Sequence, residues 1–339
     1  MATQIRKALI PSYGDESHVS IITAPIEPPP AKHVQVRVLY SGFGGSDINM
    51  RLGRYPMQKA APLTPGYNFV GTVVSAGPDC VSKPTKGDVV ACLSIYDAQA
   101  ELVNMPEQYL IRVPQGLDHQ KACALMLDWT TAYGMVSRPG KVHAGQKVFV
   151  HGMSGAVGYA TAVLCQLRGA EVYGTAGEKN HKALEALGWH PFTYTNKDWM
   201  TTMKNMGGAD VVFDPLGFES WDESYSILSH NDACLVGYGG NLDTLTNHAP
   251  RGVLMPTLKL LSRNFICPAV HRHTRFFYVT RDDKTFVPDV EALFDLLSQG
   301  KIDVRIKQIW DLEDIQEAHR KWGKAGSGFG SILVNVGAK

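Results

Sequence analysis

The chain has 339 residues, which is enough for about two domains with a large buried core. Lysine and arginine number 33 against 32 aspartates and glutamates, so the formal charge is +1, and no basic tract suggests a nucleic-acid or membrane partner. No apolar run reaches ~18 residues and the first ten residues lack the apolar segment of a signal peptide, so we expect a cytoplasmic protein.

Six cysteines are scattered along the chain and never form a Cys-x-x-Cys motif. This spacing is typical of reduced, mostly buried thiols and not of a disulfide framework or a metal centre. The composition as a whole favours an intracellular enzyme.

The first third of the chain predicts short strands separated by turn residues. In residues 33–40 apolar side chains alternate, which is typical of a half-buried strand. Further strands are expected at 1–10, 69–75, 89–93 and 109–112. Because short strands bounded by Gly, Pro or Asp are typical of all-β folds, we expect a partly open barrel that extends to about residue 120.

Three loops of this region are candidates for a functional role in addition to reversing the chain direction. Residues 41–47 are glycine-rich and lead to Gly-Arg-Tyr-Pro at 53–56, residues 65–71 read Pro-Gly-Tyr-Asn-Phe-Val-Gly, and residues 86–90 read Lys-Gly-Asp-Val-Val. We interpret the third loop as an ordinary turn, since Gly-Asp commonly precedes a strand. The first two contain candidate functional side chains, with barrel turns as the alternative interpretation: Asp47, Tyr55, Tyr67 and Asn68.

A glycine-rich turn follows an apolar strand that begins at Lys147. Its glycines are spaced Gly-x-x-Gly-x-x-Gly, and the chain continues with a predicted helix at 159–168 and a strand at 171–176. At such a turn the backbone can approach a pyrophosphate closely, and unpaired amides at the helix N-terminus face the anion. The strand-helix-strand context therefore predicts a dinucleotide site. Its expected cofactor contacts are Gly152, Ser154, Gly155, Ala156, Val157 and Gly158.

The end of the second strand bears on which dinucleotide binds. NAD-specific enzymes place Asp or Glu there to hold the ribose hydroxyls, whereas this chain has Gly177. Glu178, one residue further on, is the alternative that would suit NAD. Lys179, Asn180 and His181 offer donors for a 2′-phosphate, so we expect NADPH.

The remaining elements are expected in alternating order. Residues 209–217 and 233–240 predict two parallel strands with their following loops, and residues 241–275 predict no regular structure. Three histidines in that stretch lack a regular spacing to a carboxylate and are interpreted as a polar loop, not a metal site. Strands are expected at 276–280, 305–310 and 330–336, with helices at 287–299 and 312–322.

Five motifs in order resemble the medium-chain dehydrogenase/reductase superfamily, in its zinc-free quinone oxidoreductase branch. They are the loops at 53–56, 65–71 and 86–90, Trp-Thr-Thr-Ala-Tyr at 129–133, and the glycine turn at 151–158. The resemblance implies an α/β fold with a GroES-like, partly open β-barrel catalytic domain and a doubly wound Rossmann domain that binds NADPH. The expected boundaries are 1–122, completed by 300–339, for the barrel domain and 123–299 for the Rossmann domain.

The same resemblance predicts a site without metal. Zinc alcohol dehydrogenases of the superfamily carry a Cys where this chain has Gly44-Gly45-Ser46, and a His-Glu pair where it has Tyr67-Asn68. Without thiolate or imidazole ligands at those places, a tetrahedral zinc site lacks its ligands. Many quinone oxidoreductases also carry Asn where Gly44 stands, so that polar side chain is missing here.

Further cofactor residues are implied by the resemblance. Thr131 is expected near the nicotinamide, and the backbone at Gly237 and Tyr238 near the nicotinamide ribose. The strand expected around Phe277 and Tyr278 would contribute a backbone contact to the nicotinamide and pair with its twin in a homodimer.

Three other positions complete the predicted site. Tyr194, at the end of the strand after the glycine unit, is expected near the adenosine phosphate. Asp128 and Trp129 stand at the domain junction, where loops commonly line the substrate pocket. Their alternative interpretation is a helix cap and a core aromatic side chain, and both interpretations stay open.

The implied activity is hydride transfer from NADPH to a quinone or to the β-carbon of an α,β-unsaturated carbonyl compound. Without zinc, the oxygen that gains charge needs hydrogen-bond donors, and Tyr67 and Tyr55 are the candidate catalytic residues. Packing under the barrel rim is the alternative for both. Asn68 and Asp47 are weaker candidates for substrate contact, and water is an equal candidate for the final proton.

Three other functions remain open on the same fold. One is a trans-acting enoyl reductase or tailoring enzyme of a biosynthetic pathway, with a carrier-bound substrate. The others are a non-catalytic NADPH-binding protein and an enzyme with a non-redox reaction.

Overall fold

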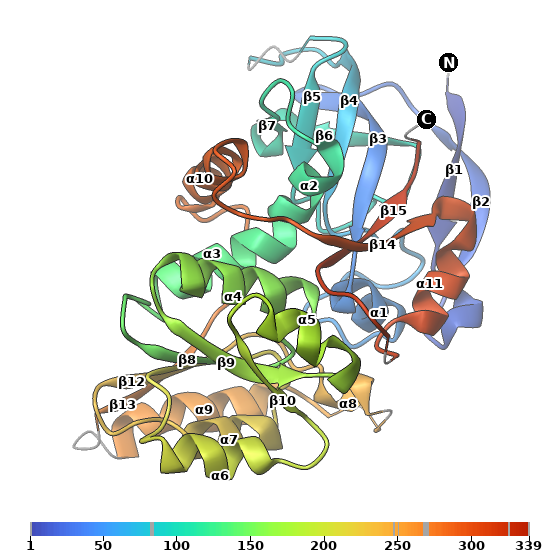
Figure 1. Ribbon diagram of the computed structural model, residues 1–339. Coiled ribbons are helices and arrows are strands. Elements are labelled where there is room, and N and C mark those ends of the chain that lie inside the picture. The colour runs from blue at the N-terminus through green and yellow to red at the C-terminus, as the bar shows by residue number, and fades with distance from the viewer. Residues whose placement is uncertain are drawn as a thin grey trace.

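The computed structural model contains two large β-sheets, which Figure 1 shows as separate layers joined through α2 (His119–Ala124) and α3 (Thr130–Ser137). It describes residues 2–81, 85–246, 248–249, 251–266, 271–324 and 326–337. Both ends of the chain lie beside the first sheet (Figure 1). We call this first sheet the mixed sheet and the second the parallel sheet.

The mixed sheet has seven strands in the order β14-β15-β3-β4-β5-β7, with β6 paired to β3. Its pairs are antiparallel except β14 with β15. Because β15 pairs with β3, the C-terminal segment completes a sheet that begins near the N-terminus. The elements of this part are β1 (Thr3–Leu9) and β2 (Ser20–Ile26), which form a separate pair, then β3 (His33–Phe43), α1 (Gly45–Arg51), β4 (Phe69–Ala76), β5 (Val89–Cys92), β6 (Leu102–Pro106), β7 (Ile111–Arg112), β14 (Ile306–Asp311), α11 (Ile315–Lys321) and β15 (Ser331–Asn335).

The parallel sheet has six strands in the order β10-β9-β8-β11-β12-β13. The strand order reverses at β8, which has β9 on one side and β11 on the other, and ligands of such sheets bind beside this point at the carboxyl ends of the strands. Its elements are β8 (Lys147–Val150), α4 (Ala156–Leu167), β9 (Glu171–Ala176), α5 (His181–Glu185), β10 (His190–Thr193), α6 (Asp198–Asn205), β11 (Val211–Asp214), α7 (Glu219–Ser226), β12 (Ala233–Gly237), α8 (Leu242–Leu245), α9 (Leu254–Ile266), β13 (Arg272–Phe276) and α10 (Phe286–Ser298).

A single buried apolar cluster includes side chains from both parts of the molecule. Tyr67 and Leu93 contribute to it from the mixed-sheet side, and Val150 and Phe213 from the parallel sheet. Burying these groups together stabilises the junction between the two sheets. The expected combination of a mainly antiparallel sheet with a doubly wound parallel sheet is therefore confirmed.

Several predicted elements differ from those observed. The strand expected at 276–280 is wrong: β13 ends at Phe276, and the expected stretch follows it without strand structure. Residues 109–112 form only the short β7, because Glu107–Tyr109 makes a 3₁₀ turn. The stretch 241–275, whose elements the sequence pattern did not indicate, contains α8, α9 and most of β13.

The described cysteines agree with the expected reduced state. Five are free, and four of these are buried: Cys92, Cys123, Cys165 and Cys234. Cys267 lies outside the described residues. No helix in the described part of the chain is long and apolar enough to cross a membrane.

Close packing of α4 against the end of β8 depends on two glycines. Gly152 has a φ of 66°, in the left-handed region that favours glycine. A Cβ added to Gly158, in the first turn of α4, would lie 2.2 Å from the carbonyl oxygen of Gly152. The helix can therefore begin directly over the strand end only because this side chain is absent.

We expect Gly158→Ala to lower the free energy of unfolding by about 1–3 kcal/mol, because the methyl group must displace backbone. Urea denaturation of the apoprotein measures the change. Gly177→Ala is the matched control, since an added Cβ there has no heavy atom within 4 Å. Equal midpoints for the two variants would contradict the close approach.

Candidate active site

The glycine turn lies at the carboxyl end of β8, beside the point where the strand order reverses. Gly152 and Gly155 are exposed, while Ser154, Ala156 and Val157 are partly exposed. Gly155 is the N-cap of the 12-residue helix α4 and makes no side-chain cap. The first amides of α4 are thus available to an anion, and the space beside Gly152 is open, so these residues fit a dinucleotide pyrophosphate.

A buried hydrogen-bond chain stands behind this turn. The amide of Gly152 donates to Thr175 Oγ1 (3.0 Å), which lies 3.3 Å from His151 Nδ1. On the other side of the ring, His151 Nε2 lies 2.9 Å from Ser224 Oγ, whose hydroxyl donates to Asp214 Oδ2 (2.7 Å). Burial lowers the pKa of His151, so the ring stays neutral and Nδ1 can accept a hydrogen bond from the Thr175 hydroxyl.

The sequence interpretation did not find this chain of groups. Its one available signal was polar residues at the ends of three otherwise apolar strands: His151 after β8, Thr175 in β9 and Asp214 in β11. This row of hydrogen bonds links the first glycine of the turn to the end of β11. It therefore holds the turn in the conformation that exposes its other amides.

The residues expected near the adenosine phosphate lie together. Ala176 of β9 pairs with Thr193 of β10, so Gly177 and Tyr194 follow neighbouring positions at the same edge of the sheet. Tyr194 is 54% exposed, and the space beside Gly177 is open. Lys179 is exposed in the next turn and makes no ion pair within the described part of the chain.

The residues expected near the nicotinamide come from three segments. Thr131 lies in the first turn of α3 and is 8% exposed. Gly237 ends β12, and its carbonyl accepts a hydrogen bond from the amide of Phe277 (2.9 Å). Tyr238 is buried, and Tyr278 follows β13 in an irregular segment, not in the strand where it was expected.

Three tyrosine hydroxyls meet at the junction of the two sheets. Tyr55 donates to the Tyr67 hydroxyl (2.8 Å), and that oxygen lies 3.1 Å from the Tyr278 hydroxyl. Tyr67 is 2% exposed, whereas Tyr278 is 53% exposed. Burial raises the pKa of both Tyr55 and Tyr67, so both phenols keep their protons near neutral pH. We call these three residues the tyrosine cluster.

Two of the weaker candidates hold the loops that carry the tyrosines. Asp47 accepts hydrogen bonds from the amides of Gly44 and Gly66 (both 2.9 Å) and is 1% exposed. Asn68 is 2% exposed and donates to the carbonyl of Cys123 (2.8 Å). The structure thus places both side chains inside the protein, where they hold loops in place.

Of the two junction residues, Trp129 is fully buried and packs edge-on against Tyr159, with ring centroids 6.3 Å apart. Trp129 therefore belongs to the apolar core, which was its alternative interpretation, and does not line the substrate pocket. Asp128 is partly exposed and accepts a hydrogen bond from Ser331 Oγ (2.6 Å). Both lie in a π-helical turn, Leu125–Trp129, which connects α2 to α3.

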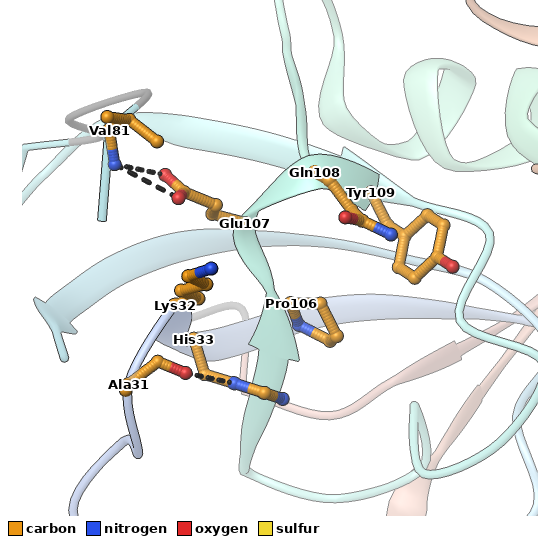
Figure 2. Close-up of a pocket in the computed structure, with 8 residues that line it drawn as sticks. All are labelled: Ala31, Lys32, His33, Val81, Pro106, Glu107, Gln108 and Tyr109. Atoms are coloured by element: carbon orange, nitrogen blue, oxygen red, sulfur yellow. Dashed lines mark hydrogen bonds between the residues drawn. The ribbon is translucent and has the colours of Figure 1, made fainter. Parts of the chain in front are cut away.

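No group of three or more His, Cys, Asp or Glu side chains among the described residues could hold a metal ion. A separate surface hollow lies on the mixed-sheet side between the segments 31–33 and 106–109 (Figure 2). There the carboxylate of Glu107 accepts from the amide of Val81 (2.9 Å). The residues of the hollow include none of the predicted site residues.

Comparison with known proteins agrees with this architecture. A family model described as alcohol dehydrogenase GroES-like domain matches residues 30–115, and one described as zinc-binding dehydrogenase matches residues 187–334. The synaptic vesicle membrane protein VAT-1 homolog of Rattus norvegicus is 28% identical over 350 aligned residues, covering 99% of this chain and 85% of that protein.

Two further similarities concern quinone oxidoreductases. The quinone oxidoreductase of Mus musculus is 29% identical over 233 residues, covering 66% of this chain and 70% of that protein. The solved quinone oxidoreductase from Coxiella burnetii has the same fold, with a TM-score of 0.83 and 20% identity over 99% of this chain and 100% of that one. The chain belongs to the medium-chain dehydrogenase/reductase superfamily of oxidoreductases, in its quinone oxidoreductase-like branch.

Proposed function

We propose that the protein is a zinc-independent, NADPH-dependent reductase that transfers a hydride to a quinone or to the C=C bond of an α,β-unsaturated carbonyl compound. The observation that carries this proposal is the tyrosine cluster, which brings three phenol donors to the junction beside the parallel sheet. The similarity to quinone oxidoreductases supports the reaction class.

In this proposal the bound dinucleotide supplies a hydride, and the chain's own residues do the rest. The amides of the glycine turn bind the pyrophosphate. The buried hydrogen bonds through Thr175 and His151 hold that turn in its conformation. The phenols donate hydrogen bonds to the substrate oxygen that gains negative charge, as an oxyanion hole does. Because Tyr67 is buried, such a bond acts in a medium of low dielectric constant, where it is strong.

We propose NADPH as the preferred dinucleotide because of the groups at the end of β9. Gly177 supplies no carboxylate to bind the ribose hydroxyls, and the exposed Lys179 is free of ion pairs with the described residues. An ammonium group there can bind the 2′-phosphate. The exposed Glu178 is the residue that would instead favour NADH.

We also propose that the chain forms a homodimer. Strand β13 is at the edge of the parallel sheet and leaves backbone groups for another strand to pair with. Four exposed apolar side chains on α9, next to it, are available for burial: Leu254, Met255, Leu258 and Phe265. Sedimentation at micromolar concentration should give twice the chain's mass, and a monomer would exclude this arrangement. The cytoplasmic location stays a prediction.

The reductase proposal is tested by NADPH oxidation with a panel of acceptors. Quinones, enones and carrier-bound enoyl thioesters should be assayed separately, and we expect turnover with at least one class. Carrier-bound thioesters as the sole substrates would assign the enzyme to a biosynthetic pathway. Tight NADPH binding without turnover on any acceptor would overturn the proposal in favour of a non-catalytic or non-redox protein.

Tyr67→Phe should lower kcat by at least ~10-fold, which corresponds to the loss of about 1.4 kcal/mol of transition-state stabilisation. Steady-state kinetics with the best acceptor measures the effect. Tyr173→Phe is the control, because that hydroxyl donates to Glu171 on β9 and is remote from the cluster. An unchanged rate for Tyr67→Phe would mean that the phenol only packs.

Lys179→Glu should raise the KM for NADPH at least ~10-fold and the KM for NADH far less, because the new carboxylate repels only the extra phosphate. Lys182→Glu makes the same charge change on the exposed face of α5 and serves as the control. Similar increases for both dinucleotides would remove Lys179 from the phosphate site.

A further inference from the structure

The carboxyl group of Asp128 is held in an unusual way for a group at the junction of the two sheets. It lies in the π-helical turn Leu125–Trp129, a conformation that frequently occurs at functional sites. Within the described part of the chain, the hydrogen bond from Ser331 Oγ (2.6 Å) is the single one that its carboxylate accepts. The residue as a whole is partly exposed, while its carboxyl group is buried.

Its neighbours place it inside the candidate active site. Ser331 begins β15, and the residue before it, Gly330, donates its amide to the carbonyl of Ser154 in the glycine turn (3.4 Å). The charge of Asp128 also contributes to raising the pKa of Tyr238, the residue after β12. Asp128 is therefore connected to the glycine turn through Ser331 and Gly330.

Asp47 is a second buried carboxyl, and burial raises its pKa to about 6 as well, so the two residues differ in their hydrogen-bond partners and not in the direction of the shift. Two backbone amides donate to Asp47, and so does the side chain of Gln99 (3.2 Å). Asp128 has one hydroxyl donor instead. The titratable groups against it are the Cys123 thiol of α2 and the Tyr238 phenol, and neither is a cation that could stabilise its charge.

The proposed reaction needs a proton as well as a hydride. Hydride addition to the β-carbon leaves an enolate, which must gain one proton at the α-carbon, or at oxygen in the case of a quinone. The phenols of the tyrosine cluster hold their protons firmly because burial raises their pKa, so they are suited to hydrogen bonding and not to proton release.

We propose that Asp128, as its carboxylic acid, delivers this proton. Its O–H bond breaks as the new C–H or O–H bond of the product forms, the two electrons having come with the hydride of the reduced nicotinamide dinucleotide. The carboxylate left behind must take a proton from water before the next cycle. This inference rests on the proposed function, and it divides the work between phenols that bind the oxygen and a carboxylic acid that supplies the proton.

Burial raises the pKa of Asp128 to about 6, which agrees with this role, because an acid works best when its pKa is near the working pH. The same shift has a cost in stability. A carboxyl whose pKa is raised on folding favours the fold while it is protonated, and this contribution is lost as the pH rises from about 4 through 6. An uncharged residue at position 128 should therefore stabilise the fold above pH 6.

The experiment compares Asp128→Asn with the matched variant Asp47→Asn. With saturating NADPH and acceptor, wild-type kcat should fall as the pH rises above about 6. Asp128→Asn should lose that dependence and be at least ~10-fold slower at pH 6, with the Kd for NADPH unchanged within ~3-fold. Its Tm should exceed that of the wild type at pH 8 and converge with it near pH 4. Asp47→Asn should melt earlier at both values, because losing an oxygen that accepts from backbone amides outweighs removing a charge whose pKa burial also raises.

Two results would overturn the inference: an unchanged rate and pH profile in Asp128→Asn, or a lower Tm at pH 8 like that of Asp47→Asn. Should Asp128→Asn fold poorly, Ser331→Ala removes the single donor and should shift the falling limb of kcat to higher pH, and no shift would also count against it. Failure of the proposed function is distinct, because then the wild type turns over none of the acceptors.

Discussion

The close approach of α4 to the end of β8 is the constraint on which the site depends. It requires hydrogen in place of a side chain at Gly158, where a Cβ would meet the carbonyl of Gly152 at 2.2 Å. The approach sets the first turn of α4 over the strand end and leaves its amides without side-chain caps. The buried hydrogen bonds from Thr175 through His151 and Ser224 to Asp214 then hold the turn in place, so the proposed anion site is already shaped without a ligand.

The same turn connects the cofactor site to the rest of the molecule. The carbonyl of Ser154 accepts a hydrogen bond from Gly330, which precedes β15 of the mixed sheet. That sheet also carries the loops of Tyr55 and Tyr67, and Tyr67 in turn meets Tyr278 from beyond β13. Contacts between the two sheets thus occur at both the phosphate end and the phenol end of the site, and a shift of one sheet would disturb both.

Local spacing was enough to predict the glycine turn and the strands on either side of it, and the resemblance of five motifs to a known superfamily predicted the class of fold. Local spacing did not predict β13. This strand lies at the edge of its sheet, and its sequence Arg-His-Thr-Arg-Phe is polar and lacks the apolar pattern of the inner strands. Long-range contacts were also invisible: 211 residues separate Tyr67 from Tyr278, and 203 separate Asp128 from Ser331. Trp129 and Asp128 are neighbours with the same prediction, yet the π-helical turn buries one and leaves the other partly exposed.

Burial has opposite consequences for the two kinds of acid in this site. It raises the pKa of a phenol further from neutral pH, which makes Tyr67 a better permanent hydrogen-bond donor and a worse source of protons. It raises the pKa of a carboxyl toward neutral pH, which makes Asp128 able to hold a proton and to release it. The proposed reaction needs a donor that stabilises the charge on an oxygen and an acid that supplies a proton, and the two kinds of buried acid suit these two roles. The cost falls on stability, because burial raises the pKa of Asp128 and charging the carboxyl therefore opposes folding, as it does for the buried Asp47.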